Sequence, residues 1–301
     1  MKSNVKVLVA LDGSPESASA VERLPRILRP DGEVMCLWVL DPERLSAWER
    51  EAGHRDPRRL RSRWKTARGD LRRALGTWRR QGLRCRGEVL LGSPERVARV
   101  EADIEEPDLL VLGVAQGWRD ALREALGARL PVVGFGPRLH PLRSVRGPAE
   151  VSVAVEHEGD ARTAIRLLEL LPAEARYRLL HVARGRPGVP PWEWSARERL
   201  ADAEARDLLR CAAASFEARG AEPRLHVVHD DDVVRGLLDV LEQDLPDLFV
   251  LTSGSAPSRP ASRARRLVRA SPVPTLVLPP AGVARPERLP RRLLRRLLQA
   301  A

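Results

Sequence analysis

The chain has 301 residues, of which 43% are hydrophobic and 31% charged, and its formal net charge at pH 7 is +11. This length is sufficient for two domains of ordinary size, and this apolar content is sufficient for packed cores. No run approaches the ~18 apolar residues of a membrane-spanning helix, and a strand begins too early to leave room for a signal peptide. We therefore expect a cytoplasmic globular protein.

The chain opens with a strand, a polar turn and a helix. Val5–Leu11 is an apolar run rich in β-branched residues, which is typical of a buried strand. Asp12, Gly13 and Ser14 follow as a turn, with Ser14 as the expected helix N-cap. The apolar residues of the helix, which we expect to face the sheet, are Ala18, Val21, Leu24 and Leu28. Such strand–turn–helix openings bind ligands in doubly wound sheets, although the three residues also form a good turn without any ligand.

Further strands and helices alternate along the first half. Strands are predicted at 33–40, 88–91, 107–113 and 131–135, and helices from about 60 to 78, after Pro94, and from 118 to 126. The long helix carries an apolar stripe that we expect to face the core: Leu60, Trp64, Ala67, Leu71, Leu75 and Trp78. Strands and helices that alternate in this way predict an α/β fold with a parallel sheet covered on both faces.

The second half repeats the first at an offset of 146 residues, so that Val151 and Val153 correspond to Val5 and Val7. The sequence PDLFVL restates PDLLVL, and PTLVLPP restates PVVGFGP. The elements expected between them are strands at 178–182 and 223–228 and helices near 201–219 and 233–241. We divide the chain into a first domain (1–139), a linker (140–148), a second domain (149–280) and a basic amphipathic tail (281–301).

Three segments resemble the universal stress protein family in its tandem form. They are VKVLVALDGSPESASAVERL, LLHVARG and GSPERVARVEADIEEPDLLVLG, and the likeness extends to about residue 280. The resemblance implies two Rossmann-like domains, each a five-stranded parallel sheet of order 3-2-1-4-5. It also implies a homodimer, or a pairing of the two halves of one chain.

The resemblance further implies an adenine-nucleotide site, with ATP as the expected ligand, in the crevice between Asp12 and Gly113. Asp12, Gly13 and Ser14 would border the ligand, and Asp12 would accept hydrogen bonds from its adenine or ribose side. Val39, at the end of the second strand, would line the adenine pocket; the alternative is that Val39 belongs to the core.

The phosphate loop departs from the family pattern Gly-x2-Gly-x9-Gly-Ser/Thr. Gly113, Gly117 and Gly127 form Gly-x3-Gly-x9-Gly, and Ala128 follows instead of a hydroxyl residue. Too few residues then remain before the next strand for the family's helix. We therefore favour Gly127 as a helix C-cap over a phosphate-binding role.

The second half departs from the family differently. Its fourth strand leads into a loop with Ser253 and Gly254, and Ser262 matches the family's hydroxyl residue at a helix start. Glu158 replaces the family aspartate, and the loop lacks the first and third glycines. Cations near this loop are Arg259, Arg263 and Arg265. Nucleotide binding is accordingly expected in the first half rather than the second.

No set of nucleophile, base and orienting group is evident, so we expect a non-enzymatic protein, and an ATP-hydrolysing enzyme is the least favoured alternative. We interpret His181 and His226 as hydrogen-bonded structural residues. His229 and the three aspartates at 230–232 are interpreted as an acidic helix cap instead of a metal site. The cysteines have no metal-binding spacing and are expected to be small core residues: Cys36, Cys85 and Cys211.

The positive charge is concentrated in two segments. Residues 50–86 contain fourteen Arg or Lys residues against three acids, interleaved with tryptophans, and residues 285–301 contain six arginines against Glu287. The first segment is interpreted as a solvated face over a core-facing stripe, with binding of a phosphate-rich partner as the alternative. Our main hypothesis is a stress-response or regulatory module with nucleotide binding in the first domain. The alternative is a nucleotide-independent protein that binds an anionic partner through these two segments.

Overall fold

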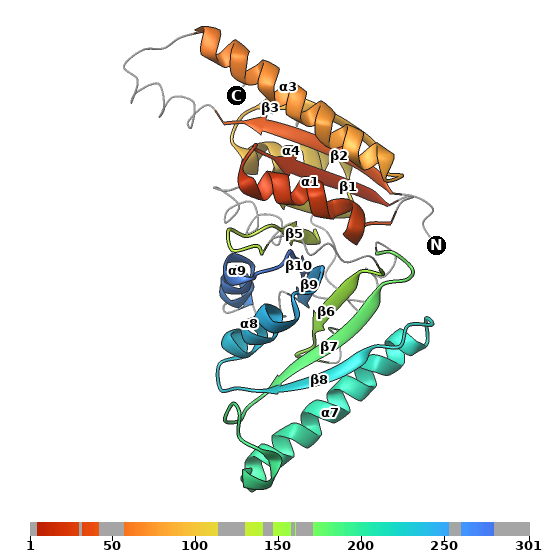
Figure 1. Cartoon of the computed structure of the whole chain (residues 1–301), viewed down its shortest axis with the longest axis vertical. Coiled ribbons are helices and arrows are strands. Elements are labelled where there is room, and N and C mark those ends of the chain that lie inside the picture. The colour runs from red at the N-terminus through yellow and green to blue at the C-terminus, as the bar shows by residue number, and fades with distance from the viewer. Residues whose placement is uncertain are drawn as a thin grey trace. The chain divides into compact units, whose positions relative to one another are not determined.

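The computed structural model describes residues 5–29, 32–41, 57–113, 130–140, 147–157, 160, 171–252 and 260–279. The chain divides into two compact units between Pro137 and Arg138. Figure 1 shows the helices and strands of both units. The predicted helix at 118–126 and the basic tail lie outside the described residues.

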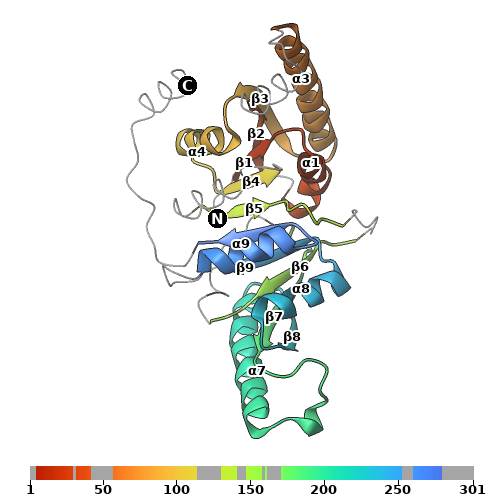
Figure 2. The same ribbon diagram turned by 90° about the vertical axis from the view of Figure 1, so that its left-hand side faces the viewer.

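The first unit is an α/β domain with a parallel sheet. Its elements are β1 (Lys6–Leu11), α1 (Pro15–Ile27), β2 (Glu33–Leu40), α3 (Pro57–Arg80), β3 (Arg84–Leu91), α4 (Pro94–Glu105), β4 (Leu109–Gly113) and β5 (Val132–Gly134). The strands lie in the order β3-β2-β1-β4-β5, and every neighbouring pair is parallel. Figure 2 shows α1 and α3 on one face of this sheet and α4 on the other. The predicted order 3-2-1-4-5 is confirmed.

The second unit repeats this architecture. Its elements are β6 (Glu150–Ala154), β7 (Arg176–Ala183), the short 3-10 helix η1 (Pro191–Glu193), α7 (Ala196–Glu217), β8 (Arg224–His229), α8 (Val233–Asp244), β9 (Leu248–Thr252), α9 (Pro260–Ala270) and β10 (Thr275–Leu278). The parallel order is β8-β7-β6-β9-β10. The sequence repeat therefore reflects a repeated fold.

Helix α1 packs through part of its predicted stripe, since Leu24 and Leu28 are buried but Ala18 is not. Ala18 is exposed, whereas Ala20, Leu24 and Ile27 are buried against the sheet. At the start of the helix the buried position is Ser17 instead of Ala18, and Ser17 forms a hydrogen bond with the end of β4. The helix start itself is confirmed, since Ser14 accepts a hydrogen bond from the Ser17 backbone N–H.

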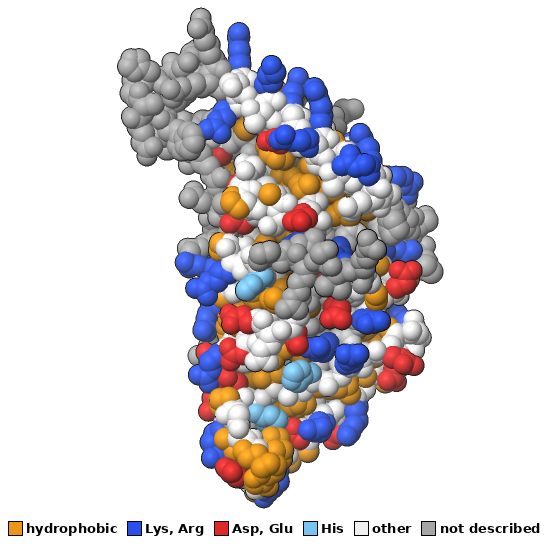
Figure 3. Space-filling view, in the orientation of Figure 1, with side chains coloured by type: hydrophobic (Ala, Val, Ile, Leu, Met, Phe, Trp, Pro, Cys, Tyr) orange, Lys and Arg blue, Asp and Glu red, His pale blue; other side chains and the backbone are white. Residues whose placement is uncertain are grey.

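Helix α3 packs through the C-terminal part of its predicted stripe. Ala67, Leu71 and Trp78 are buried, but Leu60 is 41% exposed, because the helix starts beyond the edge of the core. The Trp78 indole Nε1–H donates a 2.8 Å hydrogen bond to the Val21 carbonyl of α1. Figure 3 shows the cationic side chains along the opposite, solvent-exposed face of α3.

The cysteines do not share one environment. Cys36 in β2 is buried and Cys85 in β3 is partly buried, but Cys211 on α7 is exposed. The prediction of a core position is therefore wrong for Cys211, which lies on the outer face of its helix. No helix among the described residues is long and apolar enough to cross a membrane.

Candidate functional site

The first candidate site lies where β1 and β4 end side by side. Leu11 and Gly113 are the last residues of these strands, and they are parallel partners in the sheet. Asp12 follows β1 directly, and the chain then turns into α1. Ligands of open α/β sheets bind at this carboxyl edge, at the point where neighbouring strands have connections that diverge.

The turn at this edge is held in a defined conformation. Gly13 has a φ of +79°, in the left-handed region that favours glycine. A Cβ at Gly13 would also lie 3.3 Å from Cζ2 of Trp38, which packs against the turn from the end of β2. Asp12 Oδ1 accepts a 3.0 Å hydrogen bond from the Ser14 backbone N–H. The sequence Asp-Gly-Ser is thus both a structural turn and a carboxylate placed at the sheet edge.

Ser17 connects the turn to the neighbouring strand. Its Oγ accepts hydrogen bonds from the backbone N–H groups of Asp12 (2.8 Å) and Gly13 (3.1 Å). The same hydroxyl reaches Asp12 Oδ1 and the Gly113 carbonyl, and because it has one hydrogen it donates to one of them at a time. Ser17 is 1% exposed, so this link is internal to the unit.

Gly113 is required by packing. A Cβ at this position would lie 2.9 Å from the Cβ of Ala20 and 3.0 Å from Leu11 Cδ2, and it would lie 3.1 Å from the Ser17 Cα. Contacts that short force neighbouring groups to move. The close approach of α1 to the end of β4 therefore accounts for a glycine here independently of any phosphate.

The structure brings together only part of the predicted nucleotide site. Asp12, Gly13, Ser14 and Gly113 gather at the carboxyl edge of the first sheet. Val39 is 1% exposed and so belongs to the core of the first unit. Ser262 lies in α9, but its side chain is outside the described part of the chain. The remaining predicted residues also lie outside the described residues: Gly117, Gly127, Ser253 and Gly254.

The second unit has a related link with different chemistry. Asp160 Oδ2 accepts from the backbone N–H groups of Glu156 and His157, both at 2.9 Å. Asp160 Oδ1 accepts a 2.7 Å hydrogen bond from the hydroxyl of Thr252, the last residue of β9. A side chain after β6 thus again reaches the end of the fourth strand of its unit. Glu158, predicted to replace the family aspartate, is outside the described residues.

Arg263 was predicted as a cation near the hydroxyl-rich loop of the second half. In the structure its Nη1 contacts both carboxylate oxygens of Glu156, at 2.7 and 2.8 Å. The guanidinium is therefore engaged by a carboxylate at the carboxyl edge of β6. A ligand phosphate would have to compete with this ion pair.

The histidines and the acidic segment of the second unit have mainly structural contacts. His181 Nδ1 lies 2.7 Å from the Val155 carbonyl, as expected of a structural histidine. His226 differs, because it is exposed on β8 and forms no side-chain hydrogen bond with the described residues. Asp232 is the N-cap of α8, which confirms the helix-cap interpretation. Hydrogen bonds from Arg235 hold the pKa of the Asp230 carboxyl below its ordinary value.

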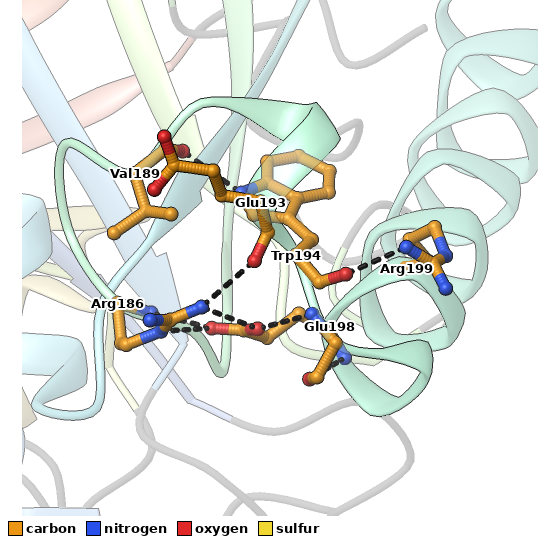
Figure 4. Close-up of polar contacts among 7 residues, drawn as sticks. Arg186, Val189, Glu193, Trp194, Glu198 and Arg199 are labelled. Carbon is orange, nitrogen blue, oxygen red and sulfur yellow. Dashed lines mark hydrogen bonds and ion pairs between the residues drawn. The ribbon is translucent and has the colours of Figure 1, made fainter.

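A polar network after β7 was not predicted (Figure 4). Arg186 donates to both carboxylate oxygens of Glu198, through Nε at 3.0 Å and Nη2 at 3.2 Å, and Nη2 also donates to the Glu193 carbonyl. Glu198 and Ser195 form a reciprocal capping box at the start of α7. The Arg186 guanidinium and then the Ser195 hydrogen bonds hold the pKa of the Glu198 carboxyl well below its ordinary value. The motif S-x-x-E before the helix is the sequence signal that would have identified this start.

Trp194 fixes the same loop from its other side. Its indole Nε1–H donates a 2.8 Å hydrogen bond to the Val189 carbonyl, and its own carbonyl accepts from Arg199 Nη1 at 2.6 Å. Its ring packs on the imidazole of His229, with 4.3 Å between centroids. His229 Nε2 in turn lies 3.3 Å from Asp202 Oδ1 of α7. The loop at 184–195 is therefore preorganised.

Among the described residues, no group of three or more His, Cys, Asp or Glu side chains could hold a metal ion.

Residues 4–129 match the model of the Universal stress protein family. No curated protein matches the chain. Among solved structures, a universal stress protein from Archaeoglobus fulgidus is similar over 92% of this chain and 97% of its own, with 16% identity and a TM-score of 0.58.

Two further structures are similar over almost the full length. A functionally unknown protein from Pseudomonas aeruginosa matches 98% of this chain and 97% of its own, with 12% identity and a TM-score of 0.56. The cytoplasmic domain of a prokaryotic cation chloride cotransporter matches 94% of this chain and 98% of its own, with 15% identity and a TM-score of 0.51. At these identities the likeness establishes the fold alone.

Proposed function

We propose that this chain, whose residues 4–129 match the model of the universal stress protein family, is a non-enzymatic stress-response module whose first unit binds an adenine nucleotide such as ATP. The observation that carries the proposal is the position of Asp12, whose carboxylate stands at the carboxyl edge where β1 and β4 end together. Ligand binding would act by favouring one conformation or one partner over another.

The geometry of the turn supports this role for Asp12. Its Oδ1 is oriented by Ser14 and Ser17, so the carboxylate does not have to be ordered when a ligand arrives. A carboxylate accepts hydrogen bonds from ribose hydroxyls and from the exocyclic amine of adenine. The first turn of α1 also begins at this edge, where the helix dipole favours negative charge.

Calorimetric titration of the full chain with ATP and with AMP tests the proposal. We expect about one nucleotide per chain, and we expect Asp12→Ala to weaken binding at least tenfold. Asp12→Asn keeps an acceptor for the Ser14 N–H, so a loss of affinity in this variant reports on the carboxylate and not on a disrupted turn. Phosphate release from ATP should not exceed that of buffer, since the chain is proposed to bind and not to hydrolyse.

Glu158→Ala is the matched control, because Glu158 is the counterpart of Asp12 in the sequence repeat. It should leave the affinity unchanged if the first unit alone binds. Absence of heat and of any thermal shift at millimolar nucleotide would refute the sensor function. Equal losses in the Asp12 and Glu158 variants would refute its assignment to the first unit.

The cationic face of α3 favours a second candidate function, binding of an anionic partner. The exposed cations on this helix are Arg61, Arg63, Lys65, Arg68, Arg72, Arg73, Arg79 and Arg80. Asp70 pairs with Arg73 and is the only acid within the helix sequence. The tryptophans argue for a modest role, because Trp78 is buried and is not available for stacking on bases.

Salt dependence distinguishes this second function from the first. Binding of a fluorescent DNA duplex, used as a generic polyanion, should weaken steeply between low and physiological salt. Replacing Arg61, Lys65, Arg68 and Arg72 together with Gln should abolish it while nucleotide binding is retained. Binding that is insensitive to salt would refute this candidate function.

The expected homodimer, or pairing of the two halves of one chain, stays a prediction.

A further inference from the structure

A cavity of about 1050 Å³ lies in the second unit, at the carboxyl end of β7. Its described lining comes from β7 and the residues after it, from the first turns of α7, and from Asp231 after β8. The described ends of β6 and β9 do not contribute, so the cavity is separate from the edge at which Asp160 contacts Thr252. The apolar lining consists of Val182, Ala183, Leu200, Ala201, Ala205 and Leu208.

The charged groups of the lining divide into engaged and available ones. Arg186 and Glu198 are bound to each other and hold the loop. Arg184 and Arg197 are exposed and line the cavity, and neither pairs with an acid among the described residues. The exposed Glu204 likewise lines the cavity, with no side-chain partner in the part of the chain that the structure describes. With Asp231, which also lines the cavity and is exposed, two cations and two acids are therefore available to a ligand.

These available charges lie at a fixed spacing along α7. Arg197 and Glu204 are seven residues apart, which is two helical turns, so they lie on the same face at roughly 10 Å along the axis. Leu200 and Ala201 lie between them, and the Leu200 side chain is 60% exposed. Arg184 joins Arg197 near the start of the helix, from the end of β7. The surface thus presents positive charge, an apolar stretch and negative charge in sequence.

We propose that this cavity binds a ligand with an acid at one end and a base at the other, separated by an apolar body, and that short apolar peptides are this class of ligand. The terminal carboxylate would contact Arg197 and Arg184, and the terminal ammonium would contact Glu204. Three extended residues span roughly 10 Å, which matches the spacing of the charges. Asp231 offers a further acceptor to peptide N–H groups.

The preorganised loop supports this assignment. The capping box of Ser195 and Glu198, and the hydrogen bond from Trp194 to Val189, fix the backbone on both sides of the cationic end. Little loop ordering is therefore needed on binding, which leaves more of the interaction energy for affinity. A volume of about 1050 Å³ exceeds what a single amino acid requires, and it accommodates a peptide of several residues.

Calorimetric titration of the full chain with trileucine tests the proposal. We expect saturable binding, weakened at least tenfold by Arg197→Gln and by Glu204→Gln. N-acetyl-trileucine amide, which has the same side chains without terminal charges, should bind at least tenfold more weakly to the unmodified chain. Both substituted side chains are exposed, so the variants should keep the circular dichroism of the parent chain.

Glu217→Gln and Arg219→Gln are matched controls, because Glu217 ends α7, Arg219 lies in the turn after it, both are exposed, and neither lines the cavity. Unchanged affinity in these controls supports the proposal. No binding of trileucine at millimolar concentration would overturn it, as would equal affinity for the capped peptide. Binding of decanoate that requires Arg197 but not Glu204 would overturn the peptide assignment in favour of a simple amphipathic acid.

Discussion

Replacing Gly113 with alanine should destabilise the first unit. The added Cβ would lie 2.9 Å from the Cβ of Ala20 and 3.1 Å from the Ser17 Cα, and neither of these atoms can move away by a change of side-chain rotamer. Overpacking of this kind costs about 1–3 kcal/mol. Alanine also restricts the unfolded chain, which offsets about 0.4–1 kcal/mol of that cost. We therefore expect a net loss of about 1–2 kcal/mol.

Urea unfolding followed by circular dichroism measures this loss, and hydrogen exchange locates it. Exchange should accelerate in α1 and at the ends of β1 and β4. Gly69→Ala is the matched control, because nothing lies within 4 Å of a Cβ at Gly69 in α3. That change should stabilise the unit by about 0.5–1 kcal/mol, through helix propensity alone. If Gly113→Ala were neutral or stabilising, the packing argument for this glycine would be refuted.

Three further predictions follow from single contacts. Trp78→Phe should cost about 1–3 kcal/mol in urea unfolding, because it leaves the Val21 carbonyl of α1 without its buried donor; a change below 0.5 kcal/mol would contradict this. The pKa of Asp232 is lowered by backbone N–H groups at the start of α8, so its stabilisation is present above the pKa of the unfolded chain and is lost as the pH falls below about 4. Asp232→Asn still caps the helix but cannot ionise, so the free energy of unfolding should fall less steeply below about pH 4 in this variant. The same pH dependence in the variant and the parent chain would contradict this role of the Asp232 carboxylate. Maleimide should modify the exposed Cys211 first and Cys36 last, because burial raises the pKa of the Cys36 thiol; peptide mapping of labelled protein decides the order.

Much of the fold could be predicted because its signals are local. The apolar run before Asp12 and the Ser-Pro pair after it identify a strand and a helix start, and the repeat transfers that assignment to the second half. Side-chain placement depended on contacts between distant residues. Ala18 was assigned to the buried face because spacing alone does not show that Ser17 points to the end of β4.

The candidate sites were predictable to different degrees. Asp12 stands at the end of a recognisable strand, so its position at the sheet edge follows from the order of elements. The cavity beside β7 depends on a loop conformation, which arises from the pairing of Arg186 with Glu198 across twelve positions. A pairing of this kind between two side chains produces no periodic pattern in the sequence from which it could be predicted. Only the capping box at Ser195 was visible in the sequence.

In each half, a hydrogen bond links the segment after the first strand to the end of the fourth strand. These two hydrogen bonds limit which segments the two halves can exchange in a recombinant chain. In the first half the helix supplies a hydroxyl, Ser17, and the strand supplies a carbonyl oxygen; in the second the helix side supplies a carboxylate, Asp160, and the strand supplies the hydroxyl of Thr252. A recombinant that joined the Asp160 turn to a strand ending in Gly113 would place the Asp160 carboxylate next to the Gly113 carbonyl. Both groups accept hydrogen bonds and neither can donate one, so the link would be lost. Gene conversion between the repeats would therefore be tolerated only when both partners of a link are copied together.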